Sequence, residues 1–177
     1  MKNLLNLGLC MIFGSFFNSK CEAIAPGEKI PNFEVKNQNG INISPANLMG
    51  QAYLLYFYPK DDTPGCTLEA QKLRDDFPNF KKHGIKILGV STQNEKSHLE
   101  FIQKYQLPFD LLVDSDSILA KSLGVRTIPI LSFHKRQSLL VSKEGTLIKF
   151  YEKVDPKVHS SEVIMDFEEY LSSKSKP

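Results

Sequence analysis

The sequence predicts an α/β fold in which a central, mostly parallel β-sheet is flanked by helices and preceded by an N-terminal extension. Two observations predict it. Short apolar segments of strand length alternate with longer segments whose apolar residues recur at helical spacing, as in parallel sheets with crossover helices. The last two strand segments are separated only by the polar turn at residues 142–146, so we expect them to form a hairpin.

Five segments are predicted to form the strands. The first, residues 52–58, is a continuous apolar run (AYLLYFY), which is typical of a strand buried on both faces. The other four predicted strands cover residues 85–91, 111–114, 137–142 and 147–151.

Helical spacing predicts four helices. The first starts at Cys66, and Pro78 is expected to break or kink it near its end. The others cover residues 95–106, 117–123 and 160–173. A βαβ unit followed by a β-hairpin and a helix is the order of elements in a thioredoxin-like fold.

Composition restricts the class of protein. A chain of 177 residues favours one domain with a core large enough to need neither a disulfide nor a metal. Its net charge of +2 provides no large basic field for nucleic acid or an anionic membrane. We therefore expect no nucleic-acid partner.

The first 23 residues have the order of features of a secretory signal peptide. Lys2 supplies positive charge, the apolar stretch 4–17 is too short to span a bilayer, and Ala23 is a small residue suited to cleavage. A buried N-terminal helix and a lipid anchor at Cys21 are weaker alternatives. We expect residues 1–23 to be removed, leaving residues 24–177 as a periplasmic or secreted domain without stable membrane association.

Signal cleavage would remove Cys10 and Cys21 and leave Cys66 as the only thiol. Cys66 follows a strand and begins a helix, at the end of the sheet where α/β proteins bind ligands. The unpaired helix N–H groups and the helix dipole favour a thiolate there, whereas Glu69 opposes it unless that carboxylate caps the helix or bonds an arginine. The alternative is an inert, buried cysteine, which is the usual state of a lone thiol.

Thr63 stands where a thioredoxin-type C-x-x-C site has its first cysteine. A dithiol exchanger needs two sulfurs, and this site has one. A single activated thiolate can instead attack a peroxide oxygen and become sulfenic acid. That reaction needs a cation near the sulfur and a hydroxyl that orients the peroxide, and Thr63 is the candidate for the hydroxyl.

The segment 59–66 matches the P-x-x-x-T-x-x-C motif of peroxiredoxins through Pro59, Thr63 and Cys66. The longer run around it, YFYPKDDTPGCTLEA, is similar to the Q-type subfamily, also called bacterioferritin comigratory protein. The resemblance covers about residues 27–171. It implies a thioredoxin fold and thiol-dependent reduction of hydrogen peroxide or organic hydroperoxides. By this resemblance Cys66 matches the peroxidatic cysteine, and the candidate substrate-binding residues are Pro59, Thr63 and Gly65.

The resemblance also implies an arginine beside the thiolate. Arg136 fits best because it directly precedes residues 137–142, and Arg126 is the alternative. Many Q-type members carry a resolving cysteine five residues after the first, where this chain has Gln71. We therefore expect a one-cysteine enzyme whose sulfenic acid is resolved by an external thiol, either thioredoxin-like, glutaredoxin-like or small. The resemblance allows a monomer or a homodimer.

The remaining candidate residues are given structural roles. Asp61 and Asp62 are expected to cap the turn that follows them, and Pro129 could be a cis proline, with trans as the default. We expect no metal or other cofactor. None of the four histidines has metal-ligand spacing, and we expect them at surface or boundary positions: His83, His98, His134 and His159.

Two other functions stay open at this point. An exported protein could use Cys66 to form mixed disulfides with client proteins, for disulfide exchange or redox sensing. A non-catalytic binding protein could also retain the fold, although packing alone does not demand Pro59, Thr63 and Cys66 at this spacing. Thiol peroxidase is the leading hypothesis, with a peroxide as the substrate.

Overall fold

A computed structural model describes residues 24–128 and 133–175. The expected signal peptide, residues 1–23, lies outside the described residues, and so does the candidate cis proline, Pro129. Within the described ranges, no helix is both long enough and apolar enough to cross a membrane.

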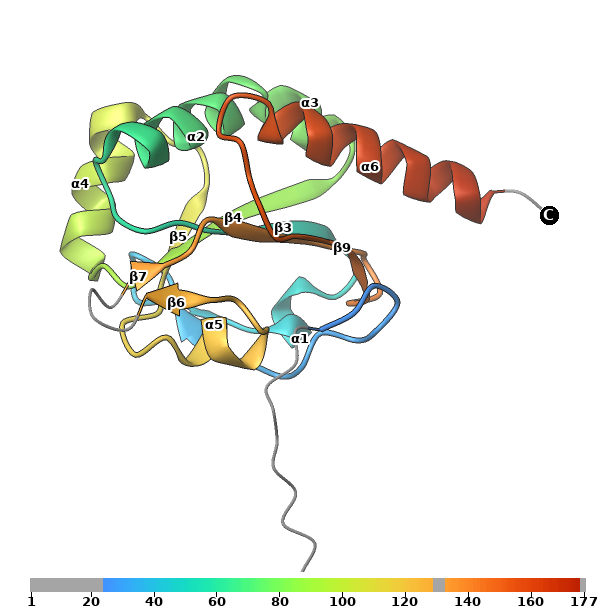
Figure 1. Ribbon diagram of the computed structural model, residues 1–177, viewed down its shortest axis with the longest axis horizontal. Helices are drawn as coiled ribbons and strands as arrows, with labels where there is room; N and C mark the ends of the chain where they lie inside the picture. The colour runs from blue at the N-terminus through green and yellow to red at the C-terminus, as the bar shows by residue number, and fades with distance from the viewer. Residues whose placement is uncertain (1–23, 129–132, 176–177) are drawn as a thin grey trace, which may run out of the picture.

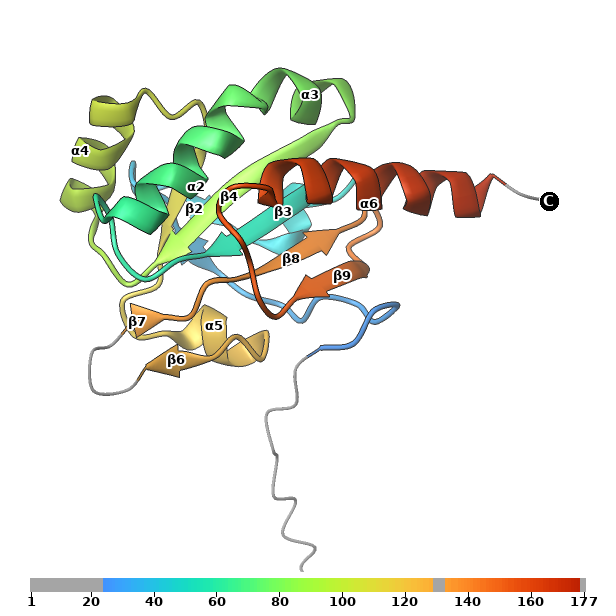
Figure 2. The same ribbon diagram turned by 45° about the horizontal axis from the view of Figure 1, so that its top comes forward.

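A five-stranded sheet in the order β5-β4-β3-β8-β9 forms the centre of the fold. The strands β3 (Ala52–Phe57), β4 (Ile85–Ser91) and β5 (Asp110–Val113) run parallel to one another. The predicted hairpin is formed by β8 (Gln137–Val141) and β9 (Leu147–Tyr151), and β8 also pairs antiparallel with β3 (Figure 2). All five predicted strands are confirmed, with ends that differ by at most one residue.

The sheet separates two layers, as Figure 1 shows. On one side lie α2 (Pro64–Asp75), α3 (Phe77–Lys82), α4 (Glu95–Tyr105) and α6 (His159–Lys174). The other side carries two short helices and two small sheets: α1 (Pro45–Leu48), α5 (Ile118–Ser122), β1 (Val35–Lys36) with β2 (Asn42–Ile43), and β6 (Thr127–Ile128) with β7 (Phe133–His134).

Strand β3 explains why the first predicted strand is apolar throughout. Its side chains alternate between the two layers, and both layers are hydrophobic cores. Leu54 and Tyr56 enter the core beneath α2, whereas Tyr53, Leu55 and Phe57 enter the core on the side of α5. A strand covered on both faces needs no polar positions, so the alternating pattern of a half-exposed strand is absent.

The helix that follows β3 begins earlier and ends earlier than its apolar spacing predicts. It starts at Pro64, so that Cys66 is its third residue, and it ends at Asp75 rather than continuing through Phe80. Pro78 explains the early end, because a proline inside a helix lacks the N–H donor and clashes with the carbonyl four residues earlier. Instead, Pro78 lies in the first turn of α3, where proline is tolerated.

Candidate functional site

The loop between β3 and α2 places Cys66 at the carboxyl end of the central strand. Thr63 has an extended backbone and is the N-cap residue of α2, and the first helical hydrogen bond runs from the Thr67 N–H to the Thr63 carbonyl at 2.8 Å. The N–H groups before this bond, including that of Cys66, have no partner within the helix. Cys66 is only 2% exposed, so its thiol is largely shielded from solvent, with the partial positive charge of the helix N-terminus on one side.

Arg136 lies beside this thiol. Its Nη2 is 3.3 Å from Cys66 Sγ, and its side chain is 18% exposed. The antiparallel pairing of β3 with β8 explains the contact, because it places Phe57, the last residue of β3, opposite Gln137. Arg136 directly precedes Gln137 and therefore stands at the end of β3 from which the loop leads to Cys66.

Arg126, the alternative arginine, is placed elsewhere. Its side chain is 60% exposed, and its guanidinium pairs with Glu152 at 2.9 Å. The backbone N–H of Arg126 donates to Gln137 Oε1 at 2.7 Å. The structure therefore brings Arg136, and not Arg126, to the cysteine.

Glu69 shares the Arg136 guanidinium with Cys66. It lies one turn further along α2, is fully buried, and accepts a hydrogen bond from Arg136 Nη1 through Oε2. Its other oxygen, Oε1, has no hydrogen-bond partner among the described residues. Burial raises the pKa of Glu69 to about 7, although the charge and hydrogen bond of Arg136 act in the opposite direction.

The guanidinium itself stays charged. Burial would lower the pKa of Arg136, but the charges of Glu69 and Cys66 and the hydrogen bonds to both outweigh burial and raise it. A fixed cation at the sulfur favours a thiolate and can stabilise an oxygen that becomes negative during a reaction. The sequence leaves two roles open for Glu69: a cap of the helix or a hydrogen bond with an arginine. In the structure Glu69 bonds an arginine, and this is the same Arg136 that contacts the sulfur.

The other candidate residues lie on the loop before Cys66 or on α2. Thr63 is half-buried, and its Oγ1 donates to the Lys60 carbonyl at 3.0 Å. Pro59 is half-buried at the start of the loop, and Gly65 is half-buried next to the Arg136 guanidinium. Gln71, where a resolving cysteine is expected in many Q-type members, is half-buried on α2.

Two expectations about the loop carboxylates are wrong. Asp61 and Asp62 do not cap the turn that leads into α2, and α2 has no side-chain cap. Both carboxylates instead accept hydrogen bonds from side chains of α4: Asp61 from Ser97 and His98, and Asp62 from Lys104 and Tyr105. Sequence spacing cannot reveal these partners, because they follow the aspartates by 35 residues or more.

The prediction of surface or boundary positions is also wrong for three of the four histidines. His98, His134 and His159 are fully buried, and only His83 is partly exposed. Each buried ring meets a polar partner: Asp61 for His98, Asp114 for His134 and the Ser138 hydroxyl for His159. His134 contacts Asp114 and the Phe57 ring rather than the thiol site.

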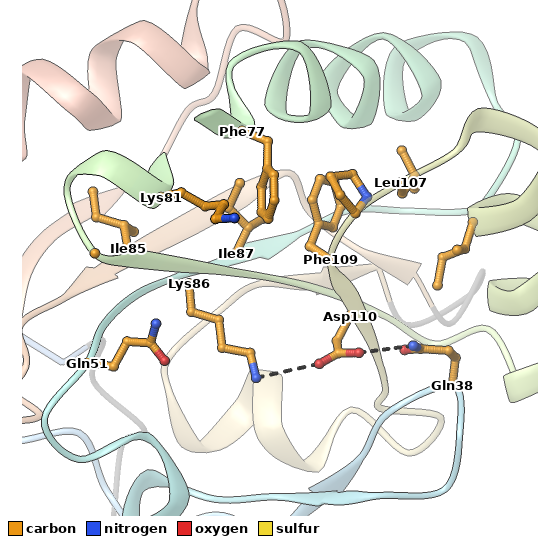
Figure 3. A pocket seen from close by; sticks show the side chains of 13 residues that line it. Gln38, Gln51, Phe77, Lys81, Ile85, Lys86, Ile87, Leu107, Phe109 and Asp110 are labelled. Atoms are coloured by element: carbon orange, nitrogen blue, oxygen red, sulfur yellow. Dashed lines mark hydrogen bonds and ion pairs between the residues drawn. The ribbon is translucent and has the colours of Figure 1, made fainter. Parts of the chain in front are cut away.

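A separate pocket of about 620 Å³ lies along β4, away from the cysteine (Figure 3). Phe77, Ile87 and Phe109 form its apolar side, while Lys86 and Asp110 lie on the opposite side of the strand. Neither Cys66 nor Arg136 lines it, so the chemistry described above does not occur there. Among the described residues, no group of three or more histidine, cysteine, aspartate or glutamate side chains could hold a metal ion.

Comparisons with known proteins agree on one family. Residues 26–150 match the model of the AhpC/TSA family. The chain is 39% identical to peroxiredoxin Bcp of Bacillus subtilis over 144 residues, which cover 78% of this chain and 91% of the relative. It is also 35% identical to the chloroplastic peroxiredoxin Q of Oryza sativa subsp. japonica over 145 residues, 81% of this chain and 67% of the relative.

Solved structures give the same picture. A cysteine-to-serine mutant of PrxQ from Xylella fastidiosa superposes with a TM-score of 0.77 at 25% identity and covers 85% of this chain and 99% of that chain. The bacterioferritin comigratory protein of Xanthomonas campestris, described for its alkyl peroxide reduction activity, superposes with a TM-score of 0.71 at 29% identity. That match covers 78% of this chain and 91% of the Xanthomonas chain.

Proposed function

Because this chain belongs to the AhpC/TSA family and is a thiol-dependent peroxidase of the peroxiredoxin Q type, we propose that Cys66 is its peroxidatic residue. The observation that carries the assignment is the 3.3 Å contact between Arg136 Nη2 and Cys66 Sγ at the N-terminus of α2. Helix dipole and guanidinium both favour the thiolate, which is the form of cysteine that reacts with peroxides.

In the first half-reaction the Cys66 thiolate attacks the terminal oxygen of the peroxide. An S–O bond forms while the O–O bond breaks, which leaves Cys66 as sulfenic acid and releases an alkoxide or hydroxide. That leaving group takes a proton from solvent and departs as alcohol or water. Arg136 stabilises the negative charge as it moves from sulfur to the leaving oxygen.

The residues around the sulfur orient the substrate. We assign the Thr63 hydroxyl and the free N–H groups of Gly65 and Cys66 to hydrogen bonds with the peroxide oxygens. To Pro59, at the start of the loop, we assign the shielding of the sulfur from water. Organic hydroperoxides are included among the substrates, since the Xanthomonas relative is described for alkyl peroxide reduction.

Once residues 1–23 are removed, the second half-reaction needs a thiol from outside the chain, because Cys66 is the only cysteine in residues 24–177. An external thiol attacks the sulfenic sulfur, which releases water and forms a mixed disulfide with Cys66. A second thiol attacks the external sulfur of that bond and frees the Cys66 thiolate. Each peroxide therefore oxidises two external thiols to one disulfide.

The proposed compartment is the periplasm or the exterior of the cell. The charge, apolar stretch and small residue at positions 1–23 support export, and the external thiol must then work outside the cytoplasm. The intact mass of the protein recovered from the periplasm or the medium tests this. A mass that corresponds to residues 24–177 supports the proposal, and a full-length protein retained in the cytoplasm contradicts it.

The proposed chemistry is tested with a full chain in which Cys10 and Cys21 are replaced by serine, so that Cys66 is the only thiol. The reduced protein is mixed with a few equivalents of hydrogen peroxide, and thiol loss and intact mass are followed. We expect rapid loss and the addition of one or two oxygens, both abolished by Cys66→Ser. Oxidation no faster than that of a free thiol would rule out Cys66 as the peroxidatic residue.

Disulfide exchange with client proteins, the alternative that the sequence leaves open, is not favoured. The relatives and structural neighbours are peroxiredoxins, and the site has one sulfur rather than two. The same experiment separates the two functions, because an exchange protein reacts with disulfides and gives no rapid peroxide consumption.

A further inference from the structure

The loop that leads to Cys66 is attached to α4 by two successive carboxylates. Asp61 is 5% exposed and accepts three hydrogen bonds: from Tyr58 Oη at 2.7 Å, from Ser97 Oγ at 2.6 Å and from His98 Nδ1 at 2.9 Å. Asn94 caps α4 by accepting from the Ser97 N–H, which fixes this turn of the helix. The Asp61 carboxylate is thus held from three sides inside the protein.

Asp62 makes the second attachment at the other end of α4. It accepts from Lys104 Nζ at 2.6 Å and from the Tyr105 hydroxyl. The pair with Lys104 is exposed to solvent, and exposed pairs contribute little. Asp62 also has a φ of 55°, a left-handed conformation that is unfavourable for a residue with a side chain. The buried contacts of Asp61 therefore determine the path of the loop.

The two ring nitrogens of His98 have different partners. Its Nδ1 faces Asp61 Oδ2 at 2.9 Å, and its Nε2 faces the Leu112 carbonyl at 3.2 Å. Both partners are acceptors, and an imidazole donates from both nitrogens only when it is protonated. The ring is 0% exposed, so water does not replace either partner.

The groups around His98 suit a cation. Asp61 faces it from the loop, the Tyr58 phenol from the end of β3 and the Leu112 carbonyl from β5. Burial raises the pKa of Tyr58 well above its usual range, so the phenol stays neutral and donates to Asp61. Burial would raise the pKa of Asp61, but hydrogen bonds from His98, Ser97 and Tyr58 and the charge of His98 outweigh it and lower that pKa.

A short chain of contacts connects this pair to the peroxide site. The Asp61 N–H belongs to the same peptide plane as the Lys60 carbonyl, and this carbonyl accepts the hydrogen bond from Thr63 Oγ1. Fixing Asp61 therefore fixes the acceptor that orients the Thr63 hydroxyl, and it fixes the backbone just before α2 begins.

We propose that His98, as a buried imidazolium, is a positioning residue of the peroxidase: by holding Asp61 it sets the loop that carries Thr63 and Cys66. The proposal rests on the proposed function of Cys66. It assigns a role to a histidine that touches neither the sulfur nor the peroxide, and whose position on α4 is far from the peroxiredoxin motif in sequence.

Two substitutions of His98 separate its two hydrogen bonds. The amide nitrogen of His98→Asn can occupy the position of Nδ1 and still donate to Asp61, whereas that of His98→Gln reaches the position of Nε2 and donates to Leu112. We expect His98→Gln to lower the second-order rate constant for Cys66 oxidation about tenfold or more, since small displacements of reacting groups are costly. His98→Asn should recover most of that loss, and His83→Gln, a histidine away from the loop, should leave the rate unchanged.

Nuclear magnetic resonance of the full chain with Cys10→Ser and Cys21→Ser tests the charge without any reference to activity. Nitrogen shifts of His98 in this chain at neutral pH should show protons on both ring nitrogens. A single protonated nitrogen, or folded His98 variants that both oxidise at the wild-type rate, would overturn the proposal. If neither variant folds, Ser97→Ala removes one donor to Asp61 and should still slow oxidation, and an unchanged rate would again overturn it.

These measurements distinguish the two levels of inference. A wild-type chain that does not consume peroxide would overturn the function of Cys66, while the nitrogen shifts would still report on the ion pair. A wild-type chain that consumes peroxide rapidly, with a neutral His98, would overturn the positioning role alone.

Discussion

Gly65 leaves the space that the Arg136 guanidinium occupies: a Cβ atom at Gly65 would lie 3.2 Å from Arg136 Nη2. Such a contact is tighter than usual, and the guanidinium cannot move freely because Glu69 and Cys66 both hold it. The arginine, and not a left-handed backbone at Gly65, therefore disfavours a side chain at this position. Its position next to the cysteine in sequence is a consequence of the site.

Gly65→Ala is expected to lower activity without lowering stability. The methyl group should displace the guanidinium from Cys66 and lower the rate of peroxide reduction several-fold. Alanine is the better helix former, so the free energy of unfolding should be unchanged or higher, by up to about 1 kcal/mol. Stopped-flow oxidation and denaturant unfolding measure the two effects. A faster enzyme would show that Arg136 can move without loss of activity. A much less stable enzyme would show that the site cannot accommodate the methyl group.

Arg136→Lys should lower the rate constant for peroxide about 10- to 100-fold, because one ammonium cannot contact both Cys66 and Glu69 as the forked guanidinium does. Arg126→Lys is the matched control. It changes an exposed arginine paired with Glu152 and should alter the rate less than about twofold. Equal effects of the two substitutions would contradict the assignment of Arg136 to the active site.

Glu69→Gln should change how stability depends on pH. The pKa of Glu69 is raised in the folded protein, from 4.5 to about 7, so the folded state holds this proton more tightly than the unfolded state. As pH rises from about 4.5 to 7, the unfolded chain loses the proton first and the wild type loses stability. The variant has no such proton, so its melting temperature relative to wild type should rise over this window and level off above it. A constant difference across the window would contradict the raised pKa.

His159→Gln should also change how stability depends on pH, but in the opposite direction and at acidic pH. Burial, with a contribution from the charge of Arg136, lowers the pKa of His159 from 6.5 to about 4. Between these values the unfolded chain takes up a proton that the folded protein refuses, so the wild type loses stability as pH falls. Glutamine can still form a hydrogen bond with the Ser138 hydroxyl, and the variant should show a shallower decline in melting temperature between pH 6.5 and 4. Parallel curves for the two proteins would show that His159 titrates normally.

The main sheet and its helices follow from the sequence because their apolar patterns are long. Strand β3 shows six buried residues in a row, and β4 and β9 have the predicted ends. The four elements of two residues each, β1, β2, β6 and β7, were beyond such reasoning. Segments of two residues have no periodicity to detect, and their pairing depends on tertiary contacts formed by the rest of the fold.

In the candidate site, too, some residues can be predicted from the sequence and others cannot. Thr63 and Cys66 belong to one local motif and can be found by reading along the chain, and Arg136 can be placed only because a strand follows it directly. The buried partners of the histidines cannot be read locally, since 37 residues separate His98 from Asp61. A histidine on a helix gives a weak signal by itself, although His98 shares a helix face with Phe101, which is also buried.

The contact between Arg136 and Cys66 joins residues 70 positions apart and exists only when β3 and β8 have paired. If Cys66 is the peroxidatic residue, as proposed, its fast reaction with peroxide therefore requires the native topology, while a partly folded chain carries an ordinary free thiol. Alkylating reagents give the reverse contrast, because they reach a buried Cys66 slowly and an unfolded one quickly. The reactions of Cys66 with peroxide and with alkylating reagents therefore change in opposite directions on folding. A refolding chain should gain peroxide sensitivity in the same kinetic phase in which it loses sensitivity to alkylation.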